Sequence, residues 1–184
     1  MRDLPAFLRQ ARDGWEYRGQ KRPDFAVEPR AGQESVWDYP RPPRLERDRR
    51  RVEVRSGDIL VADSERAFRI LETASPPTFY LPPDDVNLQY LERSARSSLC
   101  EWKGRADYWN LIAGERRIEE AAWSYATPFE GFEAVAGFFS FYPAKLECYV
   151  DGQRVQPQPG GFYGGWVTPE IVGPYKGEPG TGGW

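Results

Sequence analysis

Alternating apolar and polar residues dominate the middle of the chain and predict short β-strands. Residues 52–61 carry apolar side chains on both sides of Ser56-Gly57-Asp58, a pattern typical of a β-hairpin. Residues 108–112 and 116–125 predict a second hairpin around the turn at 113–115.

The other predicted strands follow less regular patterns. Four prolines within residues 76–83 bracket a short apolar stretch, which predicts a strand with enforced ends. Residues 137–142 and 146–150 predict a third strand pair. Residues 63–72 fit either a capped helical turn or a strand, and 129–135 fit one or two helical turns. Together these patterns predict a mainly β fold with short helical turns.

Segments of different composition flank this β-rich region, which we expect to span residues 51–152. Residues 1–50 predict a short helix over 3–13, capped by Asp3, and then a proline-rich, charged, extended arm. Residues 153–184 are rich in glycine and aromatic residues. Because exposed aromatic rings are poorly suited to a solvated linker, we expect this tail to pack onto the domain.

The length and composition limit the classes of protein to consider. A chain of 184 residues is long enough for one domain with a core. No stretch approaches the ~20 apolar residues of a membrane-spanning helix, and the first residues lack the apolar run of a secretory signal. A chain of this length with only two cysteines fits free thiols in a reducing compartment better than a disulfide-bonded scaffold. We therefore expect a cytoplasmic protein without a membrane partner, either a monomer or a homo-oligomer.

Charge and residue usage exclude several chemistries. A net charge of −3 argues against nucleic-acid binding by the whole domain. The arginines of residues 41–51 are interrupted by Glu46 and Asp48, which is typical of a solvated segment. Histidine is absent, which excludes Ser-His-Asp and Cys-His catalysis. Two cysteines cannot supply the four ligands of a structural zinc site, and the sequence identifies no cofactor.

Aromatic side chains are concentrated in residues 100–109 and 121–125. Such rings suit a pocket that stacks on a flat ligand while a lysine contacts its polar edge, although ordinary core packing explains the same composition. The expected ligand-binding residues are Tyr80, Trp102, Lys103, Tyr108, Trp109, Trp123 and Tyr125.

Catalysis has three weaker candidates, Cys100, Glu72 and Asp107. A cation such as Lys103 next to a cysteine stabilises its thiolate, so Cys100 is a conceivable nucleophile. No base or resolving partner is evident beside it, and a lone cysteine is more often inert packing. The candidates therefore define an alternative to ligand binding rather than the leading hypothesis.

Several motifs in combination resemble family 427 of the domains of unknown function, over about residues 51–152. They are Val61-Ala62-Asp63-Ser64, Pro76-Pro77-Thr78-Phe79-Tyr80, Cys100-x-Trp102-Lys103-Gly104-x-Ala106-x-Tyr108-Trp109 and Ala121-Ala122-Trp123-Ser124-Tyr125. The resemblance implies a β-tent-like fold, similar to methionine sulfoxide reductase B and to the drug-binding domain of cereblon. Some relatives in that wider class bind flat ligands in an aromatic cage, and many carry a four-cysteine zinc site that this chain lacks.

The chain departs from the family pattern at two positions, with Ser75 where members often have His and Glu101 where they often have Pro. The family sometimes carries a nucleotidyltransferase label, but this sequence argues against nucleotidyl transfer. That chemistry needs spaced carboxylates for two Mg²⁺ ions and a glycine-rich turn. Asp84 and Asp85 are adjacent, which sends them to opposite faces of an extended segment, and no such turn precedes them.

The leading hypothesis is therefore a small-molecule-binding β domain with an aromatic pocket for a flat or cyclic ligand. One alternative is an enzyme that uses Cys100 or carboxylates in the same cleft. A second alternative is a protein-interaction domain that docks a partner through its arm and tail.

Overall fold

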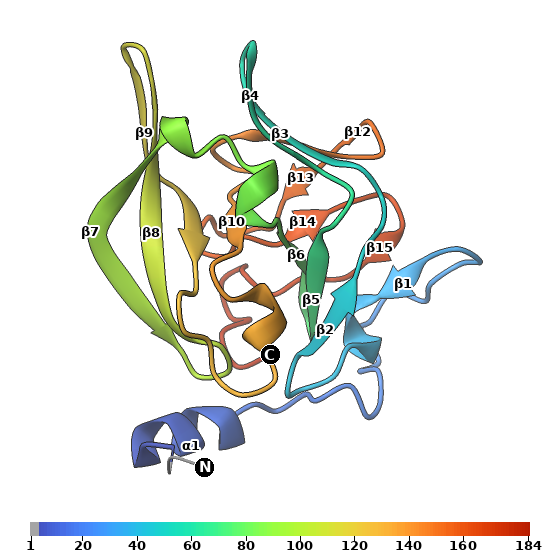
Figure 1. The fold of residues 1–184 in the computed structure, drawn as a ribbon. Coiled ribbons are helices and arrows are strands. Elements are labelled where there is room, and N and C mark those ends of the chain that lie inside the picture. Colours follow the sequence, from blue (N-terminus) through green and yellow to red (C-terminus); the bar gives the residue numbers. More distant parts are fainter. Residues whose placement is uncertain (1–3) are drawn as a thin grey trace.

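Strands dominate the computed structural model, which describes residues 4–184 (Figure 1). The predicted cap Asp3 lies outside the described residues, and helix α1 spans Ala6–Asp13. The strands are β1 (Glu34–Ser35), β2 (Arg44–Arg47), β3 (Val52–Ser56), β4 (Ile59–Ser64), β5 (Phe68–Glu72), β6 (Ser75–Tyr80), β7 (Leu91–Cys100), β8 (Gly104–Ala113), β9 (Arg116–Ser124), β10 (Phe139–Phe141), β11 (Glu147–Val150), β12 (Gln153–Arg154), β13 (Gln156–Pro157), β14 (Trp166–Val167) and β15 (Ile171–Val172). Single 3-10 turns are η1 (Val36–Asp38), η2 (Pro83–Asp85), η3 (Leu88–Tyr90) and η4 (Glu133–Val135). The prediction of a mainly β fold with short helical turns is confirmed.

Three sheets form the body of the molecule. Two have four strands each, in the orders β10-β9-β8-β7 and β12-β11-β3-β4, and the third has the order β2-β5-β6. Two small pairs, β1-β15 and β13-β14, complete the strand pairing. Figure 1 shows the β7–β9 strands at the left and the β2-β5-β6 sheet right of centre, so the two sheets face each other across the interior.

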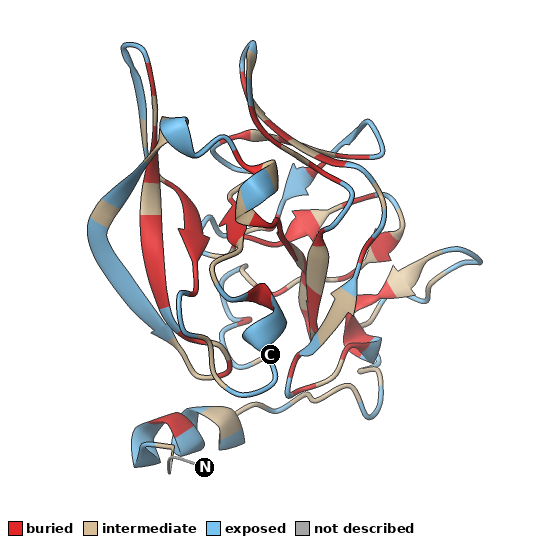
Figure 2. Cartoon of the chain, viewed as in Figure 1, coloured by how far each residue is buried: buried red, intermediate tan, exposed pale blue. Residues whose placement is uncertain are grey.

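The sheets enclose two main groups of buried apolar side chains. The larger group includes Val54, Leu111, Phe141 and Trp166, and the second is centred on Tyr80 and other aromatic rings. Strand β7 is exposed along most of its length because it is the outer strand of its sheet (Figure 2). The two buried groups lie on opposite faces of the β8–β9 strands, which explains why most of β8 and the last four residues of β9 are buried.

The structure confirms two of the predicted hairpins and corrects the third. Strands β3 and β4 pair around the Gly57-Asp58 turn, and β8 pairs with β9. The predicted pairing of residues 137–142 with 146–150 is wrong, because β10 pairs with β9 and β11 pairs with β3. Each of these short strands joins the edge of a sheet that is already formed by a hairpin.

The ambiguous segments also have definite structures. Residues 63–72 form the end of β4 and strand β5, and 129–135 include the single turn η4. Strand β6 spans Ser75–Tyr80 and contains Pro76 and Pro77, whereas Pro82 and Pro83 follow its end, so only the second pair of prolines brackets the strand as predicted.

The arm and the tail lie against the β domain. Strand β1 of the arm pairs in parallel with β15 of the tail. Arg41 of the arm is buried and donates hydrogen bonds to the carbonyl oxygens of Tyr17 and Thr73, each at 2.9 Å. Trp166 of the tail is fully buried and packs on Phe79, with ring centroids 5.0 Å apart. Within residues 4–184, no helix has the length and apolarity required to cross a bilayer.

Candidate ligand-binding cavity

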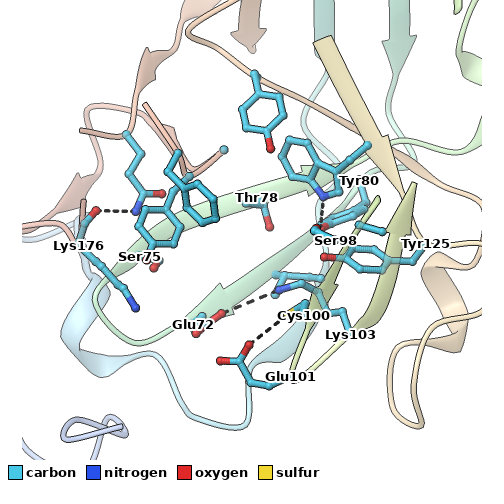
Figure 3. A pocket seen from close by; sticks show the side chains of 18 of the residues that line it. Glu72, Ser75, Thr78, Tyr80, Ser98, Cys100, Glu101, Lys103, Tyr125 and Lys176 are labelled. Atoms are coloured by element: carbon cyan, nitrogen blue, oxygen red, sulfur yellow. Dashed lines mark hydrogen bonds and ion pairs between the residues drawn. The ribbon is translucent and has the colours of Figure 1, made fainter. Parts of the chain in front are cut away.

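A cavity of about 300 Å³ lies between the facing sheets, and Figure 3 shows it from close by. One wall comes from β5 and β6, and the other comes from β7, β8 and β9. This volume is at the lower end of the ~300–1,000 Å³ that is usual for small-molecule sites.

Strand periodicity determines which side chains reach the cavity. Successive side chains of a strand point to opposite faces, so residues two apart share a face. The lining residues follow this rule in pairs: Ile70 and Glu72, Thr78 and Tyr80, Ser98 and Cys100, Ala106 and Tyr108, and Trp123 and Tyr125. The register places Tyr108 opposite Trp123 and Ile70 opposite Thr78.

Five of the seven predicted ligand-binding residues line the cavity. They are Tyr80, Lys103, Tyr108, Trp123 and Tyr125. Burial raises the pKa of the Tyr80 and Tyr125 phenols, so both remain neutral and keep a hydroxyl proton at physiological pH.

The structure places the other two predicted residues outside the cavity. Trp109 lies next to Tyr108 on β8 and therefore faces the opposite side of the sheet, where its indole nitrogen donates to Ser124 Oγ at 2.9 Å. Trp102 is buried in the turn between β7 and β8, and the guanidinium of Arg12 lies 4.9 Å from its ring centroid. Both rings therefore pack structurally rather than line the cavity.

The arm and the tail close the cavity, and sequence reasoning did not identify their contribution. Trp15 comes from the arm, and Phe162, Tyr163, Gly164 and Lys176 come from the tail. A Cβ atom at Gly164 would lie 2.2 Å from the ring of Trp123, so only glycine allows the tail to approach this closely. The aromatic content of the tail predicts that the tail packs on the domain, but it does not predict which part of the domain the tail contacts.

A group of charged side chains lies at the arm side of the cavity. Glu72 accepts a hydrogen bond from the buried Arg41 at 3.2 Å and lies 3.9 Å from Lys103 Nζ (Figure 3). Burial acts to lower the pKa of Lys103, but the ionisable groups around it hold the pKa above its ordinary value. The largest of these effects come from Cys100 and Tyr80, followed by Glu72. Lys103 is therefore protonated at neutral pH.

Trp15 is the centre of a second arrangement. Two cations lie against its ring, with Lys176 Nζ 3.4 Å and the central guanidinium carbon of Arg41 4.2 Å from the ring centroid. Its indole nitrogen donates to Glu101 Oε1 at 2.9 Å. Burial, together with the positive charge of Arg41, lowers the pKa of Lys176 to about 8. The arm and tail thus bring cationic and aromatic groups to the same end of the cavity.

The three catalytic candidates differ in position. Glu72 and Cys100 line the cavity, whereas Asp107 lies outside it and pairs with Arg93 at 2.8 Å. Burial raises the pKa of Cys100, more than Lys103 lowers it, so the thiol is protonated at neutral pH. Among residues 4–184, no three cysteine or carboxylate side chains are grouped in a way that could hold a metal ion.

Comparison with known families agrees with the motifs described above. The sequence profile of the domain of unknown function DUF427 matches residues 44–152, which is more than half of the chain. The chain belongs to the DUF427 family. No curated protein matches the chain.

The boundaries of the DUF427 match show which parts of the cavity belong to the domain. The match begins at Arg44 and so includes β2, which pairs with β5 and was assigned to the arm on sequence grounds. Both sheets that form the cavity walls lie within the DUF427 domain. Trp15, Tyr163 and Lys176 lie outside it. The extensions therefore complete a cavity whose walls are built by the domain.

Proposed function

We propose that this DUF427 protein binds a small flat or cyclic molecule in the cavity between its two sheets. The observation that carries the proposal is the cavity itself, with aromatic side chains contributed by both sheets and closed by the arm and the tail. Apolar cavities with a few convergent polar groups are the usual form of small-molecule sites.

The arrangement of the rings favours a flat ligand. Trp123 and Tyr142 are close together, with ring centroids 4.5 Å apart, and Tyr80 lies perpendicular to Trp123. Such a set of rings offers both faces and edges to an aromatic or cyclic ligand. Polar groups of the same cavity, among them Lys103 and Glu72, supply hydrogen bonds that would orient it.

Catalysis by the same cleft has less support. Cys100 is protonated at neutral pH, and Glu72 is already paired with Arg41. Asp85 belongs to the turn η2 and binds Arg66 and Ser64, which explains the adjacent acidic pair structurally. These contacts support a binding role over nucleophilic or nucleotidyl-transfer chemistry.

A thermal-shift screen of nucleosides, nucleotides, cyclic imides, sugars and aromatic acids would test the proposal. A ligand present at ~100 times its dissociation constant adds about 2.7 kcal/mol to the free energy of unfolding, which is easily detected. Binding of each hit would then be measured with Trp123→Leu and with the matched control Trp109→Leu. We expect the first variant to lose binding and the second to keep it, because only Trp123 lines the cavity.

Two outcomes would contradict the proposal. Loss of binding in both folded variants would show that the hit binds elsewhere or depends only on general stability. The absence of any hit, together with a concentration-dependent mass in solution, would favour the protein-interaction alternative.

A further inference from the structure

Lys176 is a buried cation. The residue is only 3% exposed, and its backbone is fixed on both sides. Its amide nitrogen donates to the carbonyl oxygen of Ala74 at 2.7 Å, and its own carbonyl oxygen accepts from Gln158 Nε2 at 2.6 Å (Figure 3). The side chain is therefore held at the cavity by the fold rather than by its charge.

The ammonium group of Lys176 lacks an anionic partner in the described part of the chain. No carboxylate forms an ion pair with it, and no oxygen atom of residues 4–184 accepts a hydrogen bond from its Nζ. Its neighbours are the ring of Trp15 at 3.4 Å and the ring of Tyr163 at 5.3 Å. Lys176 Nζ is not among the side-chain nitrogen atoms that are fully shut off from solvent, so the ammonium group reaches the open space of the cavity. A cation in this partly desolvated position gains from an anionic partner.

The acidic groups nearby are already engaged. Glu72 accepts from Arg41 and lies near Lys103, and Glu101 accepts from the indole nitrogen of Trp15. Arg41, Lys103 and Lys176 carry three positive charges against two negative charges on Glu72 and Glu101. The uncompensated positive charge therefore belongs to Lys176, the only one of the three cations without a carboxylate partner among the described residues.

We propose that the ligand of this cavity is an acid: a flat ring that carries an anionic group, such as a carboxylate, which pairs with Lys176 while the ring packs among the aromatic side chains. The proposal rests on the proposed function and names the class of ligand. The anionic group supplies the acceptor that Lys176 lacks, and a charge-assisted hydrogen bond in a water-poor site is strong.

The test compares ligands that differ only in charge. Nicotinate with nicotinamide, and indole-3-carboxylate with indole-3-carboxamide, are matched pairs of flat acids and neutral amides. Their dissociation constants would be measured at pH 7 by tryptophan fluorescence and by calorimetry. We expect at least one acid to bind about tenfold or more tightly than its amide, as a hydrogen bond to a charged group implies.

Variants of two lysines assign the preference to its residue. Lys176→Met is expected to reduce the difference between acid and amide to about twofold or less, and Lys176→Arg is expected to keep most of it. The control Lys21→Met removes an exposed lysine and is expected to change neither constant. Should Lys176→Met not fold, the acid affinity of the wild-type protein at pH 7 and pH 9 still tests the charge of Lys176.

The outcomes separate this inference from the proposed function. Equal binding of acids and amides by the wild-type protein would overturn the inference and leave the binding function standing. A preference for acids that survives in folded Lys176→Met would also overturn it. If none of these acids and amides binds, the inference fails, and the thermal-shift screen decides the proposed function separately.

Discussion

The indole nitrogen of Trp123 donates a hydrogen bond to the phenol oxygen of Tyr80 at 3.0 Å. The bond joins β9 to the end of β6, and so connects the two sheets that enclose the cavity. It also holds the two rings perpendicular, with centroids 6.1 Å apart. Because Tyr80 accepts this bond, its own hydroxyl proton remains available to a ligand.

Removal of the Tyr80 hydroxyl is expected to destabilise the fold. Tyr80→Phe leaves the buried indole N–H of Trp123 without an acceptor, which costs about 1–3 kcal/mol in the free energy of unfolding. Urea unfolding followed by tryptophan fluorescence measures this loss. The control Tyr149→Phe removes a half-buried hydroxyl that bonds to Glu147, and we expect a smaller cost. Equal losses for the two variants would contradict the structural role of the bond between the sheets.

A larger side chain at Thr78 is expected to fill the cavity. Thr78 lies on β6 and points toward the cavity centre in Figure 3. Thr78→Phe adds an aromatic ring in a strand, where such residues are favoured, and so is expected to raise the free energy of unfolding by about 0.5–2 kcal/mol. Binding of any cavity ligand is expected to be lost. A variant that is stable and still binds would show that the ligand site is elsewhere.

The tail is expected to depend on Gly164. Gly164→Ala places a methyl group against the ring of Trp123, so the segment must move away from the cavity. We expect weaker ligand binding and a lower melting temperature. The matched control Gly182→Ala, where nothing lies within 4 Å of the added carbon, is expected to change neither. Similar behaviour of the two variants would argue against closure of the cavity by the tail.

Titration of Lys176 is expected to affect stability and ligand affinity in opposite directions. Its pKa falls from 10.5 to about 8 on folding, so between these values the unfolded chain binds more protons. The free energy of unfolding therefore rises with pH from about 8, relative to Lys176→Met. The affinity for an acidic ligand falls over the same range, because the paired cation is lost.

Four other charged or polar groups face Lys176. They are Arg41, Glu72, Glu101 and Tyr163. Unfolding at pH 7 and pH 9, with calorimetry of acid binding at both values, measures the two effects. An acid affinity that is the same at both pH values in the wild-type protein would count against protonated Lys176 as the anchor.

Cys100 is expected to react slowly. Burial raises its pKa, so at pH 7.5 alkylation by iodoacetamide should be slower than for free cysteine. Mass spectrometry of the intact chain over time gives the rate, and Cys148→Ala isolates the reaction at Cys100. Cys100→Ser is expected to keep ligand binding. Faster alkylation than free cysteine would revive the enzyme alternative.

The sequence predicts the strands that form local hairpins, because alternation and turn residues are both local signals. It does not predict β7, whose residues Leu91–Cys100 are mostly polar and exposed, since an outer strand needs little apolar alternation. The partners of β10 and β11 were also missed. Those partners, β9 and β3, are set by tertiary packing, which leaves no local pattern.

The site shows the same limit at the level of single residues. Tyr108 and Trp109 are adjacent on one strand, so their side chains point to opposite faces and cannot both line the cavity. This alternation could have been predicted from the sequence alone. Trp15 and Lys176 are far from the DUF427 motifs, and no spacing rule connects them. Their contribution follows only from the way the arm and the tail fold over the sheets.

The contact between Trp15 and Lys176 joins residues that are made at very different times during synthesis. Strands β5 to β9 end at Ser124, so both walls of the cavity are synthesised before Lys176. A ligand that is held through Lys176 would therefore distinguish a chain completed through this residue from shorter nascent forms. Binding in this cavity would then stabilise only chains that extend through Lys176.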